Sequence, residues 1–181
     1  RPYMAEVGAD PGRLRVGWLA ATGDGTPTHA EVLGALVDAA ATLERLGHHV
    51  DEVLDFDAAS AESMATLTGH FLTTWPVWTA AALNEFEALT GTAPTADSVE
   101  PHTWALAELG RTVPGAAYVA AMDALRAVHG LVEEWFDRGW DLLVTPTIPE
   151  LPWPLGEMAA SLDADADPMA PVMRSTPVVP F

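Results

Sequence analysis

The chain has 181 residues, of which 49% are hydrophobic, and this length and composition predict a single globular domain with its own core. Its 26 acidic and 8 basic residues give a formal net charge of −18, which argues against a nucleic-acid partner or an anionic membrane surface, because both need Lys and Arg to neutralise phosphates. The absence of Cys excludes disulfides, thiolate nucleophiles and Cys-based metal sites, and it fits the reducing cytoplasm.

A strand, a helix and a second strand are predicted at the start of the chain. Residues 13–20 have the β-rich composition of a buried strand, residues 22–27 end it with turn residues, and residues 48–54 form the second strand. Between them, Thr28 and Glu31 have the spacing of a capping box, and Gly47 stands where a left-handed C-terminal cap is expected. The helix carries one apolar stripe, made of Val32, Leu33, Leu36, Val37, Ala40 and Leu43. Two strands joined by a helix predict a parallel pair with a right-handed crossover.

Residues 60–138 have a helical pattern with two breaks, one near residues 91–97 and one near residues 110–115. Within this region residues 63–84 carry no formal charge and are long enough to span a bilayer. They include five Thr, His70 and Pro76, so they predict a buried helix with a kink at Pro76 rather than a membrane span.

The third strand is predicted at residues 141–145, and the segment from Pro146 onward is rich in Pro. Such a segment is expected to be extended or looped and to lie over other structure. Together these elements predict an α/β fold of about three strands covered by several helices, without an internal repeat or a linker between domains.

Three patterns resemble ligand sites but lack parts that the chemistry needs. A Gly-x-Gly pattern after the first strand has Thr28 where a dinucleotide-binding turn has its third Gly. Residues 163–167 resemble the opening of a calcium loop, but its sixth and twelfth positions hold Pro168 and Arg174. The six His show no metal-ligand spacing. We therefore expect neither a metal nor another cofactor.

Candidate nucleophiles and aromatic residues give no self-contained active site. The chain has no Gly-x-Ser-x-Gly elbow, and no recognisable base stands near its five serines, Ser60, Ser63, Ser98, Ser161 and Ser175. Trp75 and Trp78 are three residues apart and share a predicted helix face with Phe71 and Leu72. Such an aromatic stripe is typical of a core, and it also suits the wall of a ligand pocket.

Three blocks of sequence resemble amidase-signature enzymes and occur in that family's order. They are residues 12–17 followed by 29–53, residues 118–136, and residues 141–149 with the sequence Asp-Leu-Leu-Val-Thr-Pro-Thr-Ile-Pro. The third block is the most specific. The resemblance implies a hydrolase of carbon–nitrogen amide bonds, built on a mixed sheet wrapped in helices.

The catalytic residues of the family cannot be carried over to this chain. The family uses a Lys base, a bridging Ser in a cis peptide and a nucleophilic Ser in a Gly/Ser-rich segment, whereas this chain has no Lys, no Ser-Ser pair and no Gly-Gly pair. Because the chain also starts at Arg1 rather than Met, we expect residues 1–181 to be a single C-terminal part of an amidase-type domain. The catalytic core would lie upstream and the closing strand downstream, and this chain alone is expected to be inactive.

The resemblance also implies that this part shapes the substrate pocket. Ligands of α/β sheets bind at the C-terminal ends of strands, so Thr145, Pro146 and Thr147 are the first candidates, with Trp75 and Trp78 behind them. The other interpretation of Thr-Pro-Thr is that it only terminates the strand. The expected partners are the rest of the parent chain, a small-molecule amide and, through an open sheet edge, a second copy of the chain. A non-catalytic acidic interaction or structural subunit remains the alternative function.

Overall fold

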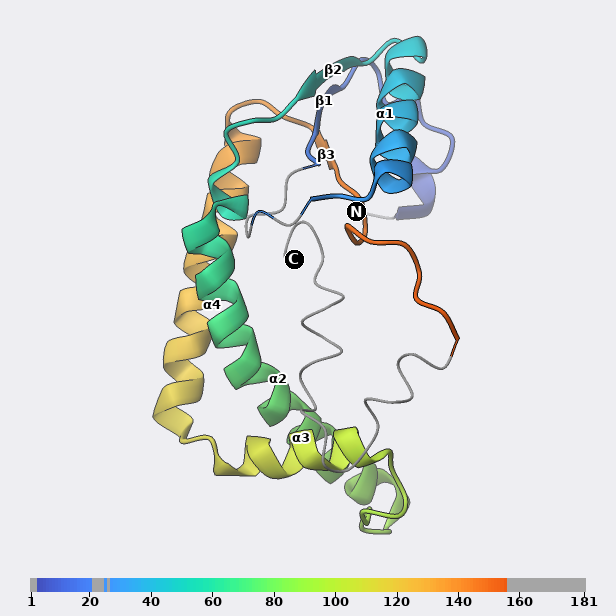
Figure 1. Ribbon diagram of the computed structural model, residues 1–181. Coiled ribbons are helices and arrows are strands. Elements are labelled where there is room, and N and C mark those ends of the chain that lie inside the picture. The colour runs from blue at the N-terminus through green and yellow to red at the C-terminus, as the bar shows by residue number, and fades with distance from the viewer. Residues whose placement is uncertain (1–2, 21–24, 26, 156–181) are drawn as a thin grey trace.

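The computed structural model describes residues 3–20, 25 and 27–155, which contain a three-stranded parallel sheet and four α-helices (Figure 1). The strands are β1 (Arg15–Trp18), β2 (His49–Glu52) and β3 (Leu142–Val144), in the order β2-β1-β3. The helices are α1 (Ala30–Arg45), α2 (Ala61–Thr90), α3 (Pro101–Thr112) and α4 (Gly115–Asp137), with short 3-10 helices η1 (Tyr3–Glu6) and η2 (Asp57–Ala59). The predicted α/β class is confirmed, and the described sheet is parallel throughout.

Strand β1 lies at the centre of the sheet because both other strands pair with it. Val16 stands opposite Val50 of β2 and Leu142 of β3. The chain passes from β1 through α1 to β2, so the predicted strand-helix-strand unit with parallel strands is confirmed. Figure 1 shows α1 on one side of the sheet and the long helices α2 and α4 on the other.

The N-cap of α1 is His29, so the predicted capping box of Thr28 and Glu31 is wrong. The His29 carbonyl accepts the first helical hydrogen bond, from Leu33 N at 2.9 Å, and His29 Nδ1 accepts the Glu31 N–H at 3.2 Å. The Thr28 hydroxyl donates instead to the Ala20 carbonyl at 2.7 Å. Because the helix begins one residue later than predicted, Glu31 is its second residue and cannot make the reciprocal bond of a capping box.

The C-terminal end of α1 agrees with the prediction, and its apolar stripe agrees only in part. Gly47 has φ +97°, a left-handed conformation that favours Gly. Leu36 and Ala40 are buried, but Leu33 and Val37 expose 36% and 45% of their surface. Two of the six residues of the predicted stripe are therefore exposed within the described structure.

The long helical region divides where Gly and Pro predicted it would. Helix α2 ends at Gly91, which has φ +70°, α3 begins at Pro101, and α4 begins directly after Pro114. Helix α2 continues for 30 residues through the buried Pro76. Among the described residues, no helix combines the length and apolarity that crossing a membrane requires.

Trp135, near the end of α4, is the centre of the core between the sheet and the long helices. Its side chain is 2% exposed, its ring stacks on Trp140 with centroids 4.9 Å apart, and Phe56 meets it edge-on at 5.5 Å. A Cβ atom at Gly17 of β1 would lie only 2.8 Å from Cζ2 of Trp135, so the missing side chain leaves room for the indole. We call this cluster the aromatic core; its buried members are Leu19, Val53, Phe56, Ala58, Val128 and Trp135.

A second cluster lies where α3 crosses α2, and small residues allow the close approach. Its buried members are Ala80, Leu83 and Ala107, and we call it the α2–α3 core. At the crossing, a Cβ atom on Gly110 would lie 2.0 Å from the carbonyl oxygen of Pro76. The backbones of the two helices therefore meet directly at this point.

Candidate functional site

The C-terminal ends of all three strands lie at one edge of the sheet because the strands are parallel. This edge is the usual ligand-binding position in α/β sheets. Thr145, Pro146 and Thr147 come directly after β3; Thr145 is half-buried, Pro146 is buried and Thr147 is exposed. The predicted strand reached Thr145, whereas β3 ends at Val144, so all three candidates belong to the loop that follows.

Backbone hydrogen bonds hold this loop at both ends. We call residues 145–149 the Thr-Pro-Thr loop. Before it, the Val144 carbonyl accepts the Leu19 N–H at 3.0 Å, which joins the loop to the end of β1. At its end, the Pro149 carbonyl accepts the His29 N–H at 2.7 Å, which joins it to the start of α1. The position of the loop therefore depends on two segments that are far away in the sequence.

Trp75 and Trp78 lie on α2, away from the sheet edge that carries the Thr-Pro-Thr loop. The Trp75 ring stacks on Phe71 with centroids 5.5 Å apart, and Trp78 Nε1 donates to the Tyr118 hydroxyl of α4 at 2.9 Å. Trp75 stands about 14 residues beyond the start of α2, which is roughly 20 Å along the helix axis. Figure 1 shows α2 running from the sheet toward α3. The structure therefore does not bring the two Trp residues together with the Thr-Pro-Thr loop.

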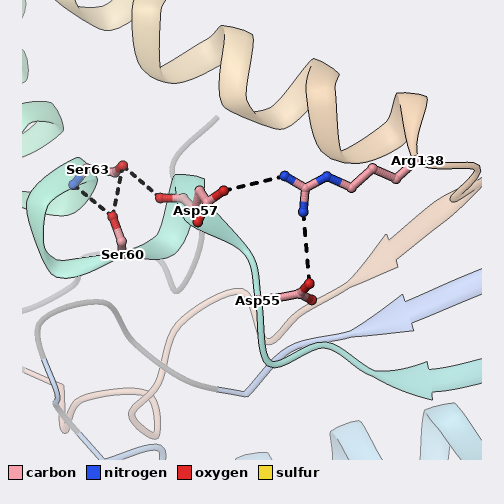
Figure 2. A network of polar contacts seen from close by, with 5 residues as sticks. All are labelled: Asp55, Asp57, Ser60, Ser63 and Arg138. Carbon is pink, nitrogen blue, oxygen red and sulfur yellow. Dashed lines mark hydrogen bonds and ion pairs between the residues drawn. The ribbon is translucent and has the colours of Figure 1, made fainter.

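A polar network at the start of α2 was not predicted from the sequence (Figure 2). The Ser63 hydroxyl donates to the Asp57 carbonyl at 2.7 Å, and the Ser60 hydroxyl donates to Ser63 Oγ at 3.0 Å. Ser60 Oγ also accepts the Ser63 N–H at 3.2 Å and so caps α2. The Arg138 guanidinium lies 3.4 Å from the Asp57 carboxylate and 3.9 Å from that of Asp55.

This network joins η2, the start of α2 and the end of α4, and its serines are not paired with a catalytic base. A Ser nucleophile needs a base that takes its proton, but the proton of Ser63 is donated to a carbonyl and that of Ser60 to another hydroxyl. Ser98 likewise donates to the Thr95 carbonyl at 2.8 Å. The Ser-x-x-Ser spacing at the start of a helical pattern is the sequence signal that would have identified the cap.

The described residues contain no cluster of three or more His, Asp or Glu side chains that could hold a metal ion. The calcium-loop pattern at residues 163–167, the serines Ser161 and Ser175, and most of the Pro-rich segment lie outside the described residues.

No protein-family model matches the chain, but two curated relatives do. They are the 6-aminohexanoate-cyclic-dimer hydrolases of Pseudomonas sp. (strain NK87) and Paenarthrobacter ureafaciens, each 32% identical over 168 residues. The matches cover 92% of this chain and 33% of each relative. The chain thus spans about a third of the length of the curated relatives it matches.

Solved structures give the same result. A structure of 6-aminohexanoate cyclic dimer hydrolase matches with a TM-score of 0.78 and 31% identity, over 93% of this chain and 34% of that one. A bacterial aryl acylamidase described as an amidase signature enzyme shares the fold, with a TM-score of 0.59 at 19% identity over 78% of this chain and 28% of its own. The resemblance inferred from the three sequence blocks is therefore confirmed. The chain is related, in sequence and in fold, to one part of an amidase-signature enzyme.

Proposed function

We propose that this chain is the pocket-shaping part of an amidase that hydrolyses a carbon–nitrogen amide bond. The supporting observation is the match to 6-aminohexanoate-cyclic-dimer hydrolase, with 32% sequence identity and a TM-score of 0.78 over more than nine-tenths of the chain. Another matching structure, with a TM-score of 0.74, is that of the hydrolase complexed with substrate. This supports a small-molecule amide, such as a cyclic amide of the 6-aminohexanoate type, as the substrate class.

In this proposal the chemistry is divided between this chain and the rest of its parent protein. A hydroxyl attacks an amide only when a base removes its proton and backbone donors stabilise the oxyanion. Without Lys, Ser-Ser or Gly-Gly, this chain has no counterpart of the family's base, serine or oxyanion segments. The rest of the parent protein therefore supplies catalysis, and this chain supplies walls of the pocket.

The Thr-Pro-Thr loop is the proposed wall nearest to the reacting bond. Thr147 is exposed at the C-terminal edge of the sheet, so its hydroxyl is free to contact a substrate there. The buried Pro146 restricts the backbone between the two threonines. Trp75 and Trp78 would form an outer aromatic wall along α2, which the 42% exposure of Trp78 supports.

The proposal also includes a cytoplasmic location, no cofactor, and no nucleic-acid or membrane partner. The net charge of −18 supports the absence of a nucleic-acid or membrane partner, and the absence of Cys supports the cytoplasmic location. The high acidity also favours the second candidate function, a non-catalytic interaction or structural subunit. The coding sequence upstream separates the two, since an amidase requires a Lys followed at a distance by a Gly/Ser-rich run. An upstream sequence without both would favour the subunit.

The activity test compares this chain with the complete protein. We expect the purified 181-residue chain to hydrolyse no amide or ester above background, and the complete protein to hydrolyse amides. Ser-to-Ala variants at each of the five Ser positions provide the control. Turnover by the chain alone that one of these changes abolishes would place a nucleophile here and contradict the proposed division.

A further inference from the structure

We propose that His29 is a positioning residue for the Thr-Pro-Thr loop, so that the start of α1 sets the shape of the substrate pocket. The catalytic consequence of this inference rests on the proposed function. Its structural part, the coupling between the α1 cap and the loop, rests only on hydrogen bonds between described residues.

The side chain of His29 fixes the backbone that holds the loop. His29 Nδ1 accepts the Glu31 N–H at 3.2 Å, which keeps His29 in its capping conformation with φ −56° and ψ 140°. A helix provides no partner for the N–H of its own N-cap residue. That N–H of His29 donates to the Pro149 carbonyl at 2.7 Å. The imidazole thus acts on the loop through the backbone of its own residue.

A second contact joins the same segment to the residues that follow β1. The half-buried Thr28 hydroxyl donates to the Ala20 carbonyl at 2.7 Å, directly before the cap. At the other end of the loop, the Val144 carbonyl accepts the Leu19 N–H and so continues the sheet ladder. Loss of the His29 cap should therefore loosen only the Pro149 end of the loop, while the β3 end stays in place.

A loosened loop should affect substrate binding more than the chemical step. The loop contains none of the reacting groups, so its contacts are similar in the ground state and in the transition state. Losing such uniform binding raises KM and leaves kcat almost unchanged. A general loss of folded enzyme would instead lower the apparent kcat.

The test uses three variants of the complete protein. His29→Ala removes the cap, and His29→Asn keeps an acceptor, because the Asn side-chain oxygen caps helices well. Ser60→Ala is the matched control, since it removes the side-chain cap of α2 without touching the loop. Amide hydrogen exchange at residue 29, corrected for intrinsic rates, reports on the bond to Pro149, and steady-state kinetics with an amide substrate report on the pocket.

We expect His29→Ala to raise the exchange rate at residue 29 about fivefold and to raise KM about fivefold. A fivefold change corresponds to about 1 kcal/mol, the typical cost of a lost N-cap. Its kcat should change less than about twofold. His29→Asn and Ser60→Ala should match the wild type at residue 29 and in KM. A complete wild-type protein that hydrolyses no amide would refute the proposed function, while the exchange test would still apply.

Three results would overturn the inference itself. Unchanged exchange at residue 29 in His29→Ala would show that the cap does not hold the loop. Faster exchange with an unchanged KM would show that the loop is held but does not shape the pocket. If His29→Asn were as defective as His29→Ala, the imidazole would act by something other than capping.

Discussion

The aromatic core and the α2–α3 core each depend on one glycine, but the two glycines make room for different neighbours. A Cβ atom at Gly17 would meet side chains, Cγ2 of Val53 at 2.5 Å and Cζ2 of Trp135 at 2.8 Å. A Cβ atom at Gly110 would meet backbone, the carbonyl oxygen of Pro76 at 2.0 Å and its carbon at 2.3 Å. Side chains can change rotamer, whereas the backbone of a packed helix cannot move without its whole element. The aromatic core should therefore tolerate an added methyl group at its glycine better than the α2–α3 core does.

The largest expected effect is that of Gly110→Ala. The new methyl group would force α3 away from Pro76 and separate the residues of the α2–α3 core, so we expect a loss of about 3 kcal/mol or more in the free energy of unfolding. Gly69→Ala on α2 is the matched control, because nothing lies within 4 Å of its Cβ position. That change should stabilise the chain by up to about 1 kcal/mol through helix propensity. Urea unfolding followed by circular dichroism measures both, and equal effects would contradict the direct backbone contact.

For Gly17→Ala we expect a smaller loss of stability, which a second substitution at Val53 should partly offset. Its new methyl group meets side chains that can shift, so we expect a cost of about 1–3 kcal/mol. Val53→Ala removes the atom nearest to that methyl group. In a double-mutant cycle, the cost of the combined variant should be smaller than the sum of the single costs by about 1 kcal/mol. Strict additivity would show that Val53 does not limit the space at Gly17.

The sequence predicted those parts of the fold that single residues determine. Gly47 adopts the left-handed conformation that was predicted for it, and Gly91 and Pro114 lie at the two predicted breaks between helices. The strand predicted at residues 141–145 is found at Leu142–Val144. Such signals are local because a Gly or Pro restricts the backbone at its own position.

Contacts between distant segments could not be predicted in the same way. Thr28 has the side chain preferred for a cap, but its hydroxyl bonds to Ala20 and leaves the cap to His29. No local pattern indicates that Trp78 pairs with Tyr118, 40 residues away, or that the Thr-Pro-Thr loop bonds to the start of α1. The candidate loop was therefore identified from its place after a strand, and its anchors only from the structure.

The measurement that tests the central claim most directly is the substrate preference of the complete protein with Thr147→Phe. A bulky ring at the proposed wall should change the ratio of kcat/KM between a small and a large amide by about tenfold or more, while activity toward the small amide persists. Thr112→Phe at the exposed end of α3 is the control and should leave that ratio unchanged. A ratio that Thr147→Phe leaves at the wild-type value would contradict a role of this loop in the substrate pocket.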